Sequence, residues 1–130
     1  MQILLVYTPT AIHLIDNVLQ GFKDRGANLV AVELPKVAEQ DFENQLEGHN
    51  LLIYVTTEVE GFSAPDPRLI TITRKATDHL IPVILITSQC RISTRELRTW
   101  GIEAAYEITS PQEAQKVAQT WVAKLPRHDS

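Results

Sequence analysis

The sequence predicts a single α/β domain built around a five-stranded parallel sheet. Its short apolar runs are rich in β-branched residues and are continuous rather than alternating, which is the pattern of strands covered on both faces. Amphipathic segments with helix start signals separate these runs. Strands that alternate with helices form a parallel sheet with right-handed crossovers, and five such strands most often take the order 2-1-3-4-5.

The five predicted strands follow one another along the whole chain. The first four are dominated by Ile, Leu and Val, whereas the fifth is weaker because Tyr and Glu interrupt its apolar run. The predicted strands span residues 3–7, 29–32, 51–55, 82–86 and 104–108.

Two helices are predicted between the first three strands. Thr8-Pro9 supplies an N-cap and a proline at the first helical position, and Gly26 ends the helix. A second helix is expected within residues 37–46, before Gly48. The apolar stripe predicted for the first helix consists of Ile12, Ile15, Leu19 and Phe22.

Three further helices are predicted from their caps. Asp66-Pro67 opens the third, whose candidate buried residues are Leu69, Ile70, Ile72 and Ala76. The fourth begins with a capping box at residues 93–96 and ends before Gly101. Residues 110–113 repeat this start signal for the last helix. Its predicted apolar face consists of Ala114, Val117, Ala118, Trp121, Val122 and Leu125.

Composition excludes several classes of protein. A chain of 130 residues has the usual length of one domain, expected here over residues 1–125 with a polar tail at 126–130. The net charge of −4 argues against nucleic acid as a partner. Met1 leads directly into an apolar run without a basic segment, and every apolar run is shorter than the roughly 18 residues that a membrane span needs. With Cys90 as the single cysteine, a cytoplasmic protein is expected.

Residues that follow the strands are the candidates for a ligand site, because this fold binds ligands at the carboxyl ends of its strands. That rim is rich in hydroxyl groups and has no carboxylate or lysine at the strand ends themselves. Its hydroxyls are interpreted either as ordinary N-caps or as ligands of an anion. No spacing of histidine, cysteine or acidic residues predicts a metal, a cofactor or a catalytic group. The rim residues are Tyr7, Thr8, Val55, Thr56, Thr87 and Thr109.

Several segments together carry a likeness to a known family. Residues 3–6, 50–54 and 81–88 match its first, third and fourth strands, and residues 97–101 followed by Tyr106 match the stretch around its aromatic switch position. In these features the chain resembles the receiver domain of two-component response regulators over essentially its full length. The resemblance implies a flavodoxin-like (CheY-like) three-layer sandwich with the strand order 2-1-3-4-5.

The departures from that family concern its chemistry. The resemblance places the acidic pair that helps hold magnesium on Tyr7 and Thr8, and the phosphate-accepting aspartate on Val55 or Thr56. The family's lysine falls on Thr109 or Ser110, and only Thr87 keeps the family's residue type. Neither valine nor threonine replaces a carboxylate nucleophile. The resemblance therefore implies a pseudo-receiver, a phosphorylation-independent signalling module that is not an enzyme.

An interaction face is expected around the fourth helix and the fifth strand. Arg91, Arg95 and Arg98 are spaced as on one helix, and Trp100 and Tyr106 follow. Arg, Tyr and Trp are enriched at interface hot spots. The resemblance implies the same face, because receivers commonly dock and dimerise there. A protein partner is expected, which includes a homodimer through the fourth helix, the fifth strand and the fifth helix.

A second resemblance keeps another function open. Residues 81–86 and 101–108 also look like the Rossmann-like domain of bacterial glycerate kinases, although those enzymes are about three times longer and the chain has no glycine-rich phosphate loop. This alternative implies a domain that binds a small molecule or an anion at the strand ends. An orphan domain cut from a larger chain is a third possibility.

Overall fold

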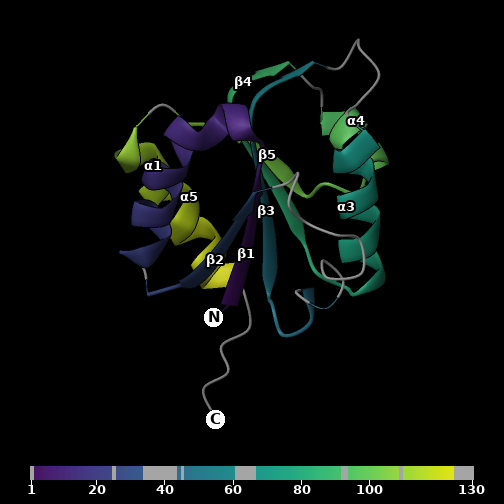
Figure 1. Ribbon diagram of the computed structural model, residues 1–130, viewed down its shortest axis with the longest axis horizontal. Coiled ribbons are helices and arrows are strands. Elements are labelled where there is room, and N and C mark those ends of the chain that lie inside the picture. The colour runs from purple at the N-terminus through teal and green to yellow at the C-terminus, as the bar shows by residue number, and fades with distance from the viewer. Residues whose placement is uncertain are drawn as a thin grey trace.

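Five parallel strands form one sheet in the computed structural model. It describes residues 2–24, 26–33, 44, 46–60, 67–91, 94–108 and 110–124. The strand order is β2-β1-β3-β4-β5, which confirms the predicted order (Figure 1). The strands are β1 (Gln2–Tyr7), β2 (Asn28–Glu33), β3 (Leu51–Glu60), β4 (Val83–Arg91) and β5 (Ala104–Glu107).

Helices cover both faces of this sheet, which gives the three layers of a flavodoxin-like sandwich (Figure 1). α1 (Ile12–Lys23) and α5 (Pro111–Lys124) lie on one face, and α3 (Pro67–Asp78) and α4 (Thr94–Thr99) lie on the other. The helix expected within residues 37–46 lies outside the described residues, apart from Asn44 and Leu46. The expected tail at 126–130 lies outside them too. No helix in the described ranges is long and apolar enough to span a membrane.

Each face of the sheet has its own hydrophobic cluster. Neighbouring residues of one strand point to opposite faces, so Leu5 packs in the cluster under α1 and α5, and Leu4 packs in the cluster under α3. The first cluster includes Phe22 and Trp121, both buried. Complete burial of one such side chain contributes about 1.5–3 kcal/mol, and this two-sided burial explains the continuous apolar runs.

The apolar stripe of α1 is rotated from the predicted one. A short 3-10 turn, η1 (Pro9–Ala11), precedes α1, so that the helix begins at Ile12. Ile12 is 64% exposed, which makes its predicted burial wrong. The buried residues of α1 are instead Leu14, Ile15, Val18, Gly21 and Phe22.

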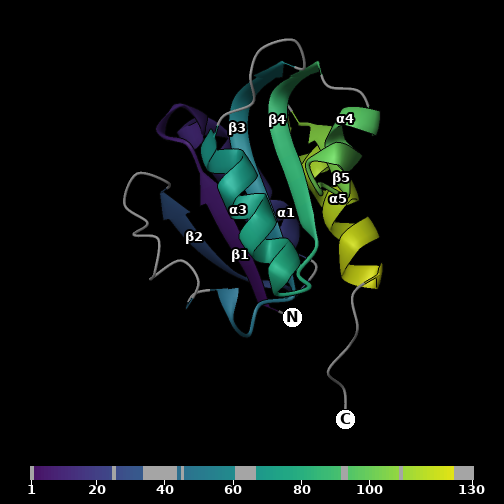
Figure 2. The same ribbon diagram turned by 90° about the vertical axis from the view of Figure 1, so that its right-hand side faces the viewer.

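The central strands are longer than predicted. β3 and β4 remain paired past the ends of their neighbours, with Glu58 opposite Gln89 and Glu60 opposite Arg91. Figure 2 shows this pair rising above the end of β1. Thr56 and Thr87 were expected in the loops that follow the predicted strands. They instead lie opposite each other within β3 and β4.

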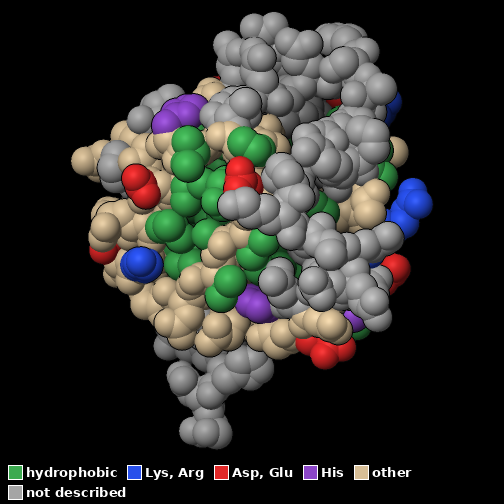
Figure 3. All heavy atoms as spheres, in the orientation of Figure 1, with side chains coloured by type: hydrophobic (Ala, Val, Ile, Leu, Met, Phe, Trp, Pro, Cys, Tyr) green, Lys and Arg blue, Asp and Glu red, His purple; other side chains and the backbone are tan. Residues whose placement is uncertain are grey.

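The outer strand β2 is the most exposed part of the sheet. Its Val30 is 47% exposed, whereas Leu4, the residue opposite Val30 on β1, is completely buried. Figure 3 shows hydrophobic side chains reaching the surface on the side of the molecule that carries β2. Strand β5 forms the opposite edge of the sheet.

Candidate functional site at the carboxyl edge of the sheet

Three threonines meet on one face of the sheet at its carboxyl edge. Thr8 follows β1, and its hydroxyl oxygen lies 3.4 Å from the hydroxyl oxygen of Thr56 on β3. Thr87 on β4 is the register partner of Thr56 and is completely buried. Paired residues of parallel strands point to the same face, so all three side chains lie on the α3 side of the sheet. Thr8, Thr56 and Thr87 of the predicted rim thus lie together at this edge.

The register of β3 distinguishes Val55 from Thr56, the two residues that the receiver resemblance places at the position of the phosphate-accepting aspartate. Val55 pairs with Ile86, and both are completely buried in the cluster under α1 and α5. Thr56 is half-buried and faces Thr8 across the top of β1. Thr56 is therefore the residue whose side chain reaches the candidate site.

Thr8 is held by the sheet rather than by the helix that follows it. Its amide donates a hydrogen bond of 3.1 Å to the carbonyl oxygen of Val55, and its side chain is 7% exposed. It occupies the N-cap position before Pro9, yet its side chain makes no capping hydrogen bond. The hydroxyl instead contacts Thr56, so the interpretation of Thr8 as a side-chain N-cap is wrong.

Capping is confirmed at the start of α5. The amide of Glu113 donates a hydrogen bond of 3.3 Å to the hydroxyl oxygen of Ser110. Ser110 is therefore a structural cap rather than part of the threonine cluster. Thr109, the remaining predicted rim residue, lies outside the described residues.

The threonine cluster offers hydroxyl groups. In the described ranges no group of three or more His, Cys, Asp or Glu residues is placed to hold a metal ion. Tyr7 at the end of β1 is half-buried and packs against the core under α1. Hydroxyl groups can donate and accept hydrogen bonds, but they do not supply the carboxylate oxygens that magnesium prefers.

The predicted interaction face divides between three elements. Arg95 and Arg98 lie exposed on α4, as predicted. Trp100 follows this helix, is half-buried and packs against the α3-side cluster. Arg91, however, is the last residue of β4 and not part of α4, because β4 continues to that point. Its predicted place on one helical stripe with Arg95 and Arg98 is therefore wrong.

Tyr106 lies on β5 and connects the edge of the sheet to α5. It is half-buried, and its hydroxyl oxygen accepts a hydrogen bond of 2.8 Å from Nε1 of Trp121. Trp121 itself is 7% exposed and belongs to the core. Figure 2 shows α4, β5 and α5 along one edge of the molecule. The described residues predicted for this face therefore lie along one edge of the sheet, with Arg95, Arg98 and Trp100 on one side of β5.

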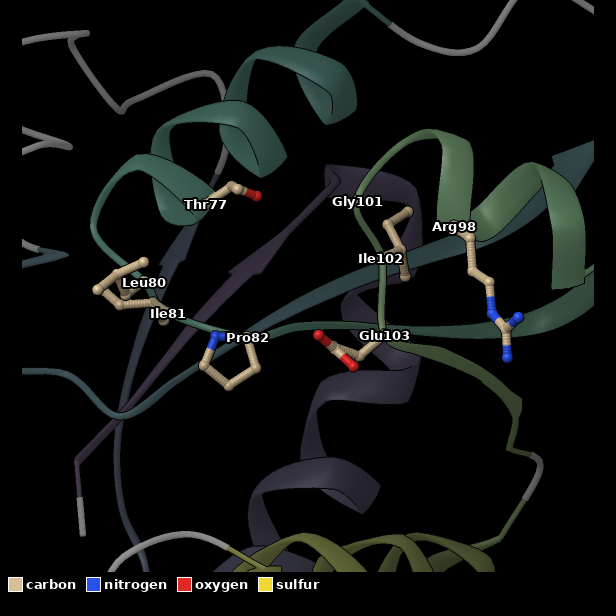
Figure 4. Close-up of a pocket in the computed structure, with 8 residues that line it drawn as sticks. All are labelled: Thr77, Leu80, Ile81, Pro82, Arg98, Gly101, Ile102 and Glu103. Atoms are coloured by element: carbon tan, nitrogen blue, oxygen red, sulfur yellow. The ribbon is translucent and has the colours of Figure 1, made fainter.

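A second feature was missed from the sequence. A groove of about 510 Å³ lies between the end of α3, the loop after α4 and the starts of β4 and β5 (Figure 4). It is at the amino ends of these strands, opposite the threonine cluster. Leu80 borders it and has a φ of 58°. The sequence contains one sign of the unusual conformation at Leu80. Residues 79–82 follow α3 without the glycine that commonly ends a helix, so another residue has to adopt the left-handed conformation there.

Comparisons with known proteins agree on the fold. No family model matches the chain, and no curated protein matches its sequence. A flavodoxin of Streptococcus pneumoniae is 13% identical with a TM-score of 0.63, over 95% of this chain and 99% of that one.

Two other solved structures with different names have the same architecture. A pilus assembly-related protein of Burkholderia pseudomallei is 16% identical with a TM-score of 0.62, over 99% of this chain and 95% of that one. The monomethylamine corrinoid protein of Methanosarcina barkeri is 15% identical with a TM-score of 0.59, over 92% of this chain and 57% of that one. Identities this low show a shared flavodoxin-like fold alone.

Proposed function

We propose that this chain is a receiver-like signalling module that works without phosphorylation, through protein–protein contact. The observation that carries the proposal is the threonine cluster. At the strand ends where the receiver resemblance requires acids, the described residues are Tyr7, Thr8 and Thr56. An acyl phosphate needs a carboxylate nucleophile, and a magnesium site needs hard oxygen ligands that usually include carboxylates.

The contact surface proposed for this module is the edge formed by α4, β5 and α5. Arg95 and Arg98 are exposed there, and the half-buried Trp100 offers an aromatic anchor beside them. Arginine and tryptophan dominate the binding energy of many interfaces. Recognition then depends on surface complementarity, and any switching comes from differential binding of a partner to two conformations.

A second candidate function is the binding of an anion or a nucleotide at the threonine cluster. It is favoured by the 3.4 Å approach of the Thr8 and Thr56 hydroxyl oxygens at the end of the sheet where this fold binds ligands. The structural likeness to a flavodoxin makes a flavin nucleotide one probe, beside ATP, phosphate and sugar acids. This candidate predicts stabilisation by ligand, whereas the signalling module predicts none.

One titration separates the two candidates. Amide NMR spectra are recorded while magnesium and beryllofluoride, which mimics a phosphoryl group on a carboxylate, are added, and then phosphate and flavin mononucleotide. The signalling module predicts that the amides of Thr8, Thr56 and Thr87 do not move. A joint, saturable shift of these three amides with magnesium and beryllofluoride would contradict a function independent of phosphorylation. The same shift with phosphate or flavin mononucleotide would favour the anion-binding function.

The contact surface has its own test. Proteins captured by the intact chain are identified by mass spectrometry, and the affinity of a purified partner is measured for the Arg95→Glu and Trp100→Ala variants. We expect at least a tenfold loss of affinity for each with the fold intact. Asp16→Ala is the matched control, because Asp16 is exposed on α1, which is not part of the proposed contact surface. Unchanged affinity in both variants would show that the proposed edge is wrong.

A further inference from the structure

The groove at the amino ends of β4 and β5 has an apolar floor with polar walls. Ile81 and Ile102 lie at its base and are 8% and 1% exposed. Thr77 comes from α3, Arg98 comes from α4, and Glu103 precedes β5 (Figure 4). Its volume of about 510 Å³ is large enough to admit side chains of another molecule.

Leu80 lies at the rim of this groove with an exposed apolar side chain and an unfavourable backbone conformation. Its side chain is 91% exposed, and its backbone φ of 58° is left-handed. This conformation closes α3, because the amide of Ile81 donates to the carbonyl oxygen of Ala76 at 2.9 Å. After α4, by contrast, the left-handed position is occupied by Gly101, with a φ of 82°.

Leucine at this position carries two costs that nothing in the described monomer offsets. A side chain with a Cβ destabilises the left-handed conformation, which glycine adopts freely. The same side chain exposes its apolar surface to water. Glycine would end α3 without either cost. Insertion of the Leu80 side chain into an apolar groove would remove the exposure, and the free energy of that burial would compensate for the backbone cost.

Charges of opposite sign flank the same groove. Arg98 and Glu103 are both exposed, and no ion pair joins them to each other or to another described residue. In Figure 4 the carboxylate of Glu103 points toward Pro82, and the guanidinium of Arg98 points away from it. Each charge is thus available to a group on another molecule.

We propose that a second copy of this chain docks in the groove about a two-fold axis. Leu80 of each copy would fill the groove of the other, and Arg98 of each copy would face Glu103 of the other. A two-fold interface requires a patch that is complementary to itself. This patch has that property, because it carries a projecting apolar side chain, a groove with an apolar floor and one charge of each sign.

This inference goes beyond the proposed function, and either can fail without the other. The groove lies at the amino ends of the strands, so such a dimer would not cover the carboxyl ends, where the threonine cluster lies. It also assigns self-association, and with it Arg98, to the groove rather than to the edge formed by α4, β5 and α5, which leaves Arg95 and Trp100 for a different protein. Their variants test the partner surface, whereas Leu80 and Glu103 test self-association.

The first test uses Leu80→Gly. This substitution should weaken the dimer, because it removes the inserted side chain, and should stabilise the monomer, because glycine adopts the left-handed conformation freely. Sedimentation equilibrium is measured from micromolar to millimolar concentrations, and unfolding is measured at a concentration where both proteins are monomeric. We expect a concentration-dependent dimer for the natural sequence, at least a tenfold weaker dimer for Leu80→Gly and a higher monomer melting temperature for that variant. Ile12→Ala is the matched control, because Ile12 is also an exposed large apolar residue and lies away from the groove. A natural chain that stays monomeric at millimolar concentration, or an unchanged dimer in Leu80→Gly, would overturn the proposal.

The second test uses charge reversal. Arg98→Glu and Glu103→Arg should each weaken the dimer, because each places two like-charged pairs across the axis. A mixture of the two variants should form a heterodimer, since every pair across the axis is then of opposite sign. Native mass spectrometry distinguishes this heterodimer from both homodimers. If the mixture associates no better than either variant alone, Arg98 does not face Glu103 across a two-fold axis.

Discussion

Nε1 of Trp121 on α5 lies 2.8 Å from the hydroxyl oxygen of Tyr106 on β5, and the two side chains join the edge strand of the sheet to its covering helix. Trp121 is 7% exposed, so its indole N–H has little access to water and depends on this acceptor. The hydrogen bond also holds the Tyr106 ring against the core under α5. The hydrogen bond therefore opposes movement of the Tyr106 ring away from the core.

Tyr106→Phe is expected to lower the free energy of unfolding by about 1–3 kcal/mol, because it leaves a buried donor without its acceptor. Urea unfolding, followed by tryptophan fluorescence and circular dichroism, measures the change. In a Trp121→Phe background no donor remains, so the same substitution should cost less. Equal losses in the two backgrounds would show that the hydrogen bond contributes nothing.

The register of β3 predicts opposite tolerances at two neighbouring positions. Val55→Asp would place a carboxylate in a completely buried site, and it should unfold the domain or cost more than about 4 kcal/mol. Thr56→Asp, at a half-buried position beside Thr8, should leave the domain folded with a loss below about 2 kcal/mol. Thermal unfolding of the two variants checks this. A stable Val55→Asp together with an unfolded Thr56→Asp would mean that the register at the candidate site is wrong.

The strands and their order could be predicted because two-sided burial leaves a strong local signal. Residues 3–7 and 51–55 are continuous apolar runs, and both became central strands with a different cluster on each face. The face of α1 was misassigned, because two apolar stripes overlap in its sequence at Ile15 and Phe22. The buried stripe also contains Leu14 and Val18, and Ile12 lies outside it.

The candidate site was only partly predictable. Thr8, Thr56 and Thr87 were identified because parallel strands end at one edge, but the choice between Val55 and Thr56 needs the register. Arg91 was misplaced because the pairing of β4 with β3 beyond Thr87 is a tertiary effect without a local apolar signal. The groove beside Leu80 brings together segments after α3 and after α4, so its shape appears only in three dimensions.

The close packing of α1 on α5 predicts an unusual effect at Gly21. A Cβ atom built on this residue would lie 2.7 Å from the carbonyl carbon of Ala114 and 2.8 Å from its Cβ, which is closer than such atoms approach. Gly21→Ala should therefore destabilise the domain by about 1–3 kcal/mol, although alanine normally stabilises a helix interior relative to glycine. Chemical unfolding with Asp16→Ala as the surface control in the same helix measures the difference.

Removal of the Ala114 side chain tests the cause of that loss. Because the clash at Gly21 also involves backbone atoms of α5, Ala114→Gly should restore only part of the stability lost in Gly21→Ala. Complete restoration would mean that α5 is free to shift, and a Gly21→Ala variant as stable as the natural chain would mean that the two helices do not approach so closely.

Thr73 on α3 offers the opposite case, a position where the natural residue is not the most stable one. Its side chain is completely buried, and its hydroxyl oxygen has no hydrogen-bond partner among the described residues. Valine has the same shape with a methyl group in place of the hydroxyl, so Thr73→Val should raise the free energy of unfolding by about 1–2 kcal/mol.

Thr77→Val is the matched control one turn later, since the exposed Thr77 donates a hydrogen bond of 2.9 Å to the carbonyl oxygen of Thr73. That control should cost up to about 1 kcal/mol, so the two variants should move the urea midpoint in opposite directions. If Thr73→Val loses as much stability as Thr77→Val, the buried hydroxyl has a partner and the packing of α3 against the loop at Gly101 differs from that described.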